Sequence, residues 1–210
     1  MKIAVLGASG WIGSHIAKEA ASRGHEVVAI VRDSSKIEQE GLETRTFDLL
    51  DPQAKINDVT SDIDVVIASI GGRALGNHEL VKQSAEKLLS ELPSGRRLMW
   101  VGGAGSLEVA PNVELVTVPD FPEEYKAEAL AQGEALEVFK QSNSDVQWTF
   151  VSPAAEIFPG ETTSQYRIGG DQLLTDAEGN SKISVSDYAI AMIDVLEGDE
   201  HINQRIGVAY

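Results

Sequence analysis

The chain has 210 residues, a formal net charge of −16 at pH 7 and no cysteine. The length suits one domain with a sizeable core, and the charge argues against nucleic acid or an anionic membrane surface as a main partner, because both attract basic surfaces. The lack of cysteine excludes disulfides, thiolate metal sites and a cysteine nucleophile, and it favours a reducing, cytoplasmic location. With scattered histidines and no long apolar run, we expect neither a metal site nor a membrane segment.

The first elements of the chain surround a glycine-rich stretch. The apolar run 2–6 predicts a buried strand, and the apolar spacing over 12–21 predicts a helix. Gly7 and Gly10 lie between the expected strand and helix, and Gly13 lies at the start of the helix. This strand–turn–helix context is typical of a dinucleotide site. The first glycine permits the turn, the second lets backbone approach a pyrophosphate, and the third lets the helix pack on the sheet. The free N–H groups at the helix start would then face the phosphates.

Short apolar runs alternate with helical patterns as far as residue 151. That alternation predicts a Rossmann-like α/β fold, a doubly wound parallel sheet with helices on both faces. We expect a single domain over 1–210, in which the loop-rich segment 156–184 caps the open sheet edge and the substrate side of the cleft. Further expectations are strands at 26–31, 44–47, 64–70, 97–101, 147–151 and 206–209, and helices from Asp51-Pro52, at 78–91, at 123–142 and, capped by Ser186-Asp187, at 187–197.

Longer stretches of the chain resemble a known group of proteins. The first is GASGWIGSHIAKEAASRGHEVVAIVRD (7–33), which resembles the N-terminal signature of extended and atypical short-chain dehydrogenases. Later segments are similar to the bacterial NADH-flavin reductases, a group of NmrA-like NAD(P)-binding proteins: VGGAGSLEVAP (101–111), PDFPEEYKAEALAQGEALEVF (119–139), WTFVSPAAEIFPGETT (148–163), YRIGGDQLL (166–174) and ISVSDYAIAMIDVLE (183–197). The resemblance covers the whole chain and implies a domain that binds a nicotinamide cofactor.

The end of the second strand bears on the choice of cofactor. NAD-preferring relatives hold the ribose hydroxyls there with an acidic residue, whereas this chain has Val31 followed by Arg32. Arg32, with hydroxyl neighbours such as Ser35, suits a 2′-phosphate, which takes charge-assisted hydrogen bonds. Asp33 keeps an alternative open, because it lies twenty residues after the last loop glycine, the usual place of the ribose acid. Its other expected roles are to cap the next turn or to pair with Lys36. We expect NADP(H) as the preferred cofactor and NAD(H) as the alternative.

Further cofactor contacts are expected from loops at the carboxyl ends of the strands, where open α/β sheets bind ligands. The resemblance implies adenine beside Asp48-Leu49 and nicotinamide beside Ser152-Pro153-Ala154. Trp11 either borders the phosphates or packs, and Arg73 either reaches a phosphate or is solvated. The expected cofactor residues are Gly7, Ser9, Gly10, Trp11, Ile12, Gly13, Arg32, Ser35, Asp48, Leu49, Ser69, Ile70, Gly71, Ser152, Pro153 and Ala154.

The acid–base pair that reductases of this superfamily carry is missing. The pair is Tyr-x-x-x-Lys, in which the lysine lowers the pKa of the tyrosine. Here Tyr125 is followed directly by Lys126, and alanine stands at 129. This argues against alcohol–ketone chemistry and against sugar epimerisation. The catalytic candidates are Ser106, which either hydrogen-bonds the acceptor or caps a turn, and Tyr125 and Lys126, which either line the cleft or lie on a helix surface.

Hydride transfer to a flavin or quinone needs mainly the alignment of two flat rings, because the acceptor stabilises its own charge and takes a proton from water. The expected function is an NADPH-dependent reductase of a flavin, a quinone or a similar planar acceptor, with flavin as a substrate. The alternative is an NmrA-like regulatory protein that senses nucleotide by binding NAD(P) without turnover, and an isomerase or dehydratase is the weakest hypothesis. An open apolar cleft over the nicotinamide would favour the reductase and a filled one the sensor. A monomer and a homodimer both stay open.

Overall fold

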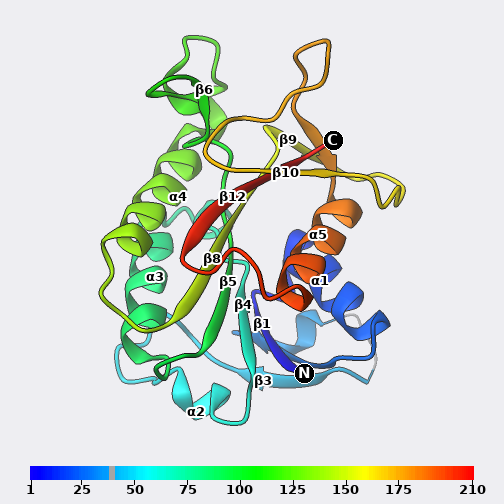
Figure 1. The fold of residues 1–210 in the computed structure, drawn as a ribbon. Helices are drawn as coiled ribbons and strands as arrows, with labels where there is room; N and C mark the ends of the chain where they lie inside the picture. Colours follow the sequence, from blue (N-terminus) through cyan, green and yellow to red (C-terminus); the bar gives the residue numbers. More distant parts are fainter. Residues whose placement is uncertain (38–40) are drawn as a thin grey trace.

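The computed structural model describes residues 1–37 and 41–210. Its central sheet is built from β1 (Lys2–Leu6), β2 (Glu26–Val31), β3 (Glu43–Thr46), β4 (Val65–Ala68), β5 (Arg97–Val101), β8 (Gln147–Pro153), β10 (Arg167–Gly169) and β12 (Gln204–Ala209). These strands lie in the order β10-β12-β8-β5-β4-β1-β2-β3 (Figure 1), and neighbours are parallel except β10 and β12. The predicted Rossmann-like, doubly wound fold is confirmed.

Helices cover both faces of this sheet (Figure 1). One face carries α1 (Trp11–Ser22) and α5 (Val185–Glu197), and the other carries α3 (Glu79–Glu91) and α4 (Glu123–Gln141). Residues 3–6 of β1 form an unbroken apolar run because helices cover this strand on both faces. Ile3 and Val5 pack in the layer of α1 and α5, whereas alternate residues such as Leu6 pack in the layer of α3 and α4. Each side chain of a strand covered on both faces is therefore buried.

The segment after β3 differs from the prediction, because no helix begins at Asp51-Pro52 in the described structure. The carboxylate of Asp51 accepts a hydrogen bond from the backbone N–H of Gln53 at 2.8 Å, which closes a turn instead. Only α2 (Asn57–Thr60), a helix of one turn, follows before β4. A local aspartate-to-backbone bond thus competes successfully with the helical start that proline favours.

The loop-rich segment 156–184 caps the sheet edge through β10, which pairs antiparallel with β12. Its ends form β9 (Glu156–Phe158) and β11 (Lys182–Ser184), which pair with each other. The predicted cap of α5 is wrong by two residues: the hydroxyl of Ser184, rather than Ser186, accepts from the backbone N–H of Asp187 at 3.0 Å. The helix consequently begins at Val185, directly after β11.

A short hairpin, β6 (Glu108–Ala110) with β7 (Val113–Glu114), and the single turns η1 (Ser34–Lys36), η2 (Arg73–Leu75) and η3 (Leu115–Thr117) complete the described elements. None of the helices in the described ranges is long and apolar enough to cross a membrane. The strand order reverses between β1 and β4. From this point β1, β2 and β3 follow one another toward one edge of the sheet, and β4, β5 and β8 follow one another toward the other edge. A crevice is expected above the carboxyl ends of strands at such a switch point.

Candidate functional site

The glycine loop between β1 and α1 is shaped by close backbone contacts. Gly7 has φ +78°, and a Cβ there would lie 2.2 Å from the carbonyl oxygen of Ser69 at the end of β4. A Cβ on Gly13 would lie 2.3 Å from the carbonyl oxygen of Gly7. Gly10 is the N-cap of α1 and no side chain caps the helix, so its first N–H groups are free for an anion. The loop therefore requires glycine at positions 7 and 13, because backbone atoms occupy the space that a Cβ would need.

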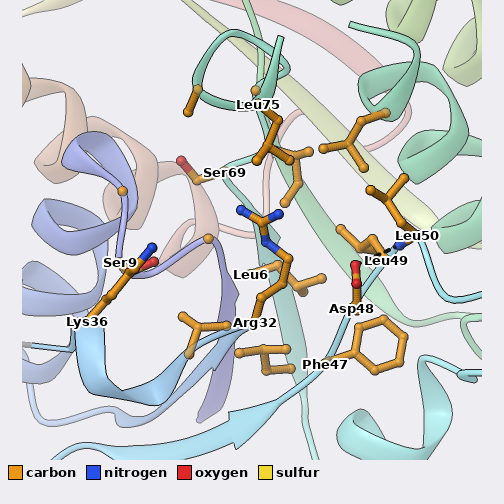
Figure 2. Close-up of a pocket in the computed structure, with 18 of the residues that line it drawn as sticks. Leu6, Ser9, Arg32, Lys36, Phe47, Asp48, Leu49, Leu50, Ser69 and Leu75 are labelled. Atoms are coloured by element: carbon orange, nitrogen blue, oxygen red, sulfur yellow. Dashed lines mark hydrogen bonds between the residues drawn. The ribbon is translucent and has the colours of Figure 1, made fainter. Parts of the chain in front are cut away.

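A cleft of about 520 Å³ opens above this loop at the switch point (Figure 2). We name it the switch-point cleft. The loops after β1, β2, β3 and β4 supply most of its walls, as expected for the carboxyl ends of parallel strands. Its lining residues are Leu6, Gly7, Ser9, Gly10, Ile30, Val31, Arg32, Lys36, Phe47, Asp48, Leu49, Leu50, Ser69, Ile70, Gly71, Arg73, Ala74, Leu75, Leu80 and Glu128.

The turn after β2 brings two cations to the cleft. Figure 2 shows the side chain of Arg32 extending into it toward the loop that carries Ser69, while Lys36 lies on the side of Ser9. Lys36 was missed as a site residue by the sequence analysis; the single turn η1 places it four residues after Arg32 on the same cleft. Arginine and lysine together suit a phosphate that is bound beyond the pyrophosphate.

Asp33, the alternative ribose acid, has a different role in the structure. Its carboxylate caps η1 by accepting from the backbone N–H of Ser35 at 3.0 Å and from the hydroxyl of Ser35 at 2.6 Å. These hydrogen bonds, first the one from the hydroxyl, lower the pKa of Asp33. Neither Asp33 nor Ser35 is among the residues that line the switch-point cleft. The turn cap thus uses the serine hydroxyl that was expected to contact the cofactor.

The far end of the cleft is mostly apolar. Leu50 and Leu75 flank it with exposed side chains, 41% and 42% accessible, so they offer apolar surface to a ligand in the cleft. Leu49 lies on the same wall, and the carboxylate of Asp48 accepts from the backbone N–H of Leu50 at 2.9 Å (Figure 2). Apolar walls with a carboxylate at the edge suit a nucleobase. The sequence analysis expected the adenine of the cofactor beside Asp48 and Leu49, at this end of the cleft.

A second cavity of about 300 Å³ adjoins the first, and we name it the β5–β8 cavity. Ser69, Ile70, Gly71 and Glu128 line both, so the two spaces share one wall. The residues that line only the β5–β8 cavity are mostly apolar: Ile12, Val101, Gly102, Gly103, Ala104, Gly105, Leu115, Phe121, Tyr125, Ala129, Gln132, Pro153, Ala154, Ala155 and Ile157. From the segment 156–184, expected to cover the substrate side, only Ile157 lines this cavity.

The three catalytic candidates do not come together. Tyr125 lines the β5–β8 cavity and is 46% exposed. Lys126 lies outside both linings and pairs with Glu123 at 3.6 Å on the helix surface. Ser106 is buried and also outside them, and its Oγ accepts from Nη1 of Arg205 at 3.4 Å. The loop after β5 thus directs its serine to a buried arginine, away from the cavity.

Among the remaining expected cofactor residues, Ile12, Pro153 and Ala154 line the β5–β8 cavity. Ser152 is fully buried outside it, and its hydroxyl has no hydrogen-bond partner among the described residues. Trp11 is 45% exposed outside both cavities, with its ring edge-to-face against His15. Within the described residues, no group of His, Asp or Glu side chains is arranged to hold a metal ion.

Two polar residues of α4 were not singled out in the sequence. Glu128 accepts from the backbone N–H groups of Gly72 and Arg73, both at 2.9 Å from Oε2. The amide of Gln132 donates to the carbonyl of Ile70 at 2.9 Å and accepts from the indole of Trp100 at 3.0 Å. Their helical spacing was the signal available in the sequence: Glu128 lies three positions before Ala131, and Gln132 lies three before Ala135, both of which are core residues of α4. Polar residues on such a buried helical face usually have specific hydrogen-bond partners.

Comparisons with known proteins agree with this geometry. A family model described as NAD(P)H-binding matches residues 7–199. The protein YwnB of Bacillus subtilis (strain 168) is 43% identical, with 99% of this chain and 98% of that protein covered. A solved structure from Burkholderia pseudomallei, of a "putative exported protein", is 41% identical with a TM-score of 0.88, covering 100% of both chains. SP1627 from Streptococcus pneumoniae TIGR4, "a putative NADH-flavin reductase", is 37% identical with a TM-score of 0.90, covering 100% of this chain and 99% of that one.

Proposed function

The chain belongs to the NAD(P)H-binding family, and on that premise we propose that it is an NADPH-dependent reductase that transfers a hydride to a flavin, a quinone or a similar planar acceptor. The oxidoreductase class and the nicotinamide cofactor follow from the family and the fold. The observation that carries the finer proposal is the β5–β8 cavity, an open and mostly apolar space that adjoins the switch-point cleft. A dinucleotide bound along both would end with its nicotinamide in that cavity.

The preference for NADPH over NADH is supported by the charges of the cleft. Arg32 and Lys36 line it at the exit of β2, where an NAD-preferring relative would carry an acid, and Val31 stands there instead. In a chain with a net charge of −16, cations on a cleft wall are conspicuous. Two cations beside the ribose would form charge-assisted hydrogen bonds with a 2′-phosphate.

The proposed acceptor follows from what the cavity offers. Its walls include the rings of Phe121 and Tyr125, and the position of the superfamily lysine is occupied by Ala129. A bound nicotinamide cofactor would supply the hydride, and the acceptor ring would take up its two electrons together with a proton from water. The protein then needs mainly to hold two flat rings in contact. A volume of about 300 Å³ suits a diffusing substrate that inserts its ring edge, so we propose flavin as a substrate.

The sensor hypothesis is favoured by a separate observation. Of the expected catalytic side chains only Tyr125 lines the cavity, because Ser106 is engaged by Arg205 and Lys126 lies on the helix surface. A protein that binds nucleotide without turnover needs no acid–base group. The open cavity weighs against it, since a sensor has no need of an acceptor space beside the nicotinamide. One chain lines both spaces, so neither function requires a second copy of the chain. The cytoplasmic location is a separate prediction from the sequence.

Steady-state oxidation of NADPH and NADH with FMN, FAD and a soluble quinone tests the proposal. We expect turnover with at least one acceptor and a higher kcat/KM for NADPH than for NADH. Tight NADPH binding without turnover above background for any acceptor would instead refute the reductase and favour the sensor hypothesis. A preference for NADH with retained turnover would overturn only the assignment of Arg32 and Lys36.

A further inference from the structure

Glu128 is the charged residue of α4 that faces inward to the site. It is partly buried, and it lines both the switch-point cleft and the β5–β8 cavity. Its Oε2 accepts from the backbone N–H groups of Gly72 and Arg73, and Nδ1 of His78 lies 3.1 Å from the same oxygen. Oε1 lies 3.3 Å from the amide nitrogen of Gln132. A carboxylate with this many donors is held in one orientation.

The loop that these bonds hold, residues 70–78, is tightly folded. A Cβ on Gly72 would lie 2.4 Å from the carbonyl oxygen of Asn77, so the two ends of the loop are in backbone contact. A Cβ on Gly71 would lie 3.2 Å from Oε1 of Glu128. The carboxylate therefore fills the space beneath the loop and satisfies two of its N–H groups, which would otherwise be left without acceptors.

This loop is also the wall that the two cavities share. Ile70 and Gly71 line both, and Arg73 lines the switch-point cleft. The guanidinium of Arg73 lies 4.6 Å from the centroid of the Tyr125 ring. Tyr125 lies on α4, one turn before Glu128. The loop is thus attached to α4 at two points, by the Glu128 carboxylate through its backbone and by the Tyr125 ring through its cation.

We propose that Glu128 is a positioning residue that holds the loop 70–78 in the shape that binds the nicotinamide nucleotide. It does so by fixing the backbone at Gly72 and Arg73, so that the cation of Arg73 and the backbone of Ile70 and Gly71 face the phosphates and the ribose of the cofactor. Its own negative charge does not repel those phosphates strongly, because the bonds that it accepts neutralise it in part. The inference rests on the proposed function only in placing the nucleotide in the cleft.

The test compares NADPH affinity, measured by fluorescence titration, with hydrogen exchange at the Gly72 and Arg73 amides. The variants are Glu128→Gln, which removes the charge and one of the two acceptor oxygens, and Glu128→Asp, which keeps the charge but shortens its reach. Glu134→Gln is the matched control, since this glutamate lies exposed on the same helix. Binding needs no turnover, so an inactive protein would refute the proposed function and leave this test intact.

We expect Glu128→Gln to weaken NADPH binding roughly tenfold, the scale of one hydrogen bond to a charged group, and to speed exchange at both amides. Glu128→Asp should give an intermediate Kd, and Glu134→Gln should bind as the unaltered protein does. Arg73→Met, alone and combined with Glu128→Gln, adds a measurement that general destabilisation would not affect. If Glu128 acts through the position of Arg73, the two losses of affinity will be less than additive.

The proposal is overturned if Glu128→Gln binds NADPH as tightly as the unaltered protein while the Gly72 and Arg73 amides exchange faster. That result would mean that the carboxylate only packs the loop. Should Glu128→Gln not fold, Glu128→Asp decides by the same two measurements. Fully additive losses in the combined Arg73 and Glu128 variant would also overturn it.

Discussion

The guanidinium of Arg73 lies over the ring of Tyr125, 4.6 Å from its centroid. Arg73 lines the switch-point cleft and Tyr125 lines the β5–β8 cavity, so this contact joins the two halves of the site. It also covers one face of the ring with a cation, so an acceptor ring can stack only on the other face, and the hydroxyl is a second group that Tyr125 offers to the cavity.

Replacing Tyr125 separates those two uses. Tyr125→Phe keeps the ring and its cation, so we expect kcat and the acceptor KM to change by less than about twofold. Tyr125→Ala should raise the acceptor KM roughly three- to tenfold, corresponding to ~0.5–1.5 kcal/mol of aromatic stacking, with the Kd of NADPH unchanged. Leu130→Ala, an exposed leucine of α4 outside both cavities, is the control. A large fall in kcat for Tyr125→Phe would instead make the hydroxyl a proton donor.

Removing the cations of the β2 exit tests the cofactor preference. We expect Arg32→Met and Lys36→Met each to weaken NADPH binding roughly tenfold or more, since a hydrogen bond to a charged group contributes about 1.5–3 kcal/mol. NADH, which lacks the 2′-phosphate, should bind as before. Lys82→Met removes an exposed cation of α3 that lines neither cavity and should change neither affinity. Equal losses for NADPH and NADH would place these cations on the pyrophosphate.

Two glycines within helices, Gly13 of the glycine loop and Gly133 of α4, allow a matched comparison of glycine-to-alanine substitutions. A Cβ on Gly13 would lie 2.3 Å from the carbonyl oxygen of Gly7, so Gly13→Ala should destabilise the fold by about 1–3 kcal/mol and weaken NADPH binding. Gly133 in α4 is different, because its nearest neighbour would be the Cβ of Ser106 at 3.9 Å. Gly133→Ala should stabilise by about 0.5–1 kcal/mol, as alanine favours a helix interior. Denaturant unfolding measures both, and a harmless Gly13→Ala would contradict the close packing.

The pH dependence of stability should be most visible at Asp187, which is fully buried. Burial raises the pKa of this carboxyl, but hydrogen bonds from the Tyr210 hydroxyl, from Thr163 and from the backbone of Ser164 outweigh it, so the pKa lies below its ordinary value. A lowered pKa in the folded state contributes stability above about pH 4, and that contribution is lost as the pH falls through the ordinary value toward the folded one.

We therefore expect Asp187→Asn to lower the free energy of unfolding at pH 7 by about 2 kcal/mol and to flatten its fall below about pH 4. Urea unfolding between neutral pH and pH 3 measures both effects. Tyr210→Phe, which removes one donor at 2.6 Å, should show a smaller loss in the same direction. An unchanged acid dependence in Asp187→Asn would assign the acid sensitivity to other carboxylates.

Much of this protein follows from its sequence. Each strand buried on both faces is an apolar run, and each covering helix has an apolar face, so the alternation of the two predicts the sheet and its layers. Gly7, Gly10 and Gly13 lie at the junction of a strand and the first turn of a helix, and this context together with their spacing locates the switch-point cleft. Arg32 was found because it directly follows a strand whose end must lie at the cleft.

Only the tertiary structure decided the other side of the site. Glu128 reaches Gly72 across 56 positions of sequence, and Ser106 is engaged by Arg205 across 99. Periodicity and spacing encode how a segment folds on itself and which of its faces is buried. They do not encode which polar groups meet when separate segments pack, because that depends on the register and distance of whole elements. The sequence by itself thus predicted the glycine loop at the switch-point cleft, and packing decided which side chains line the β5–β8 cavity.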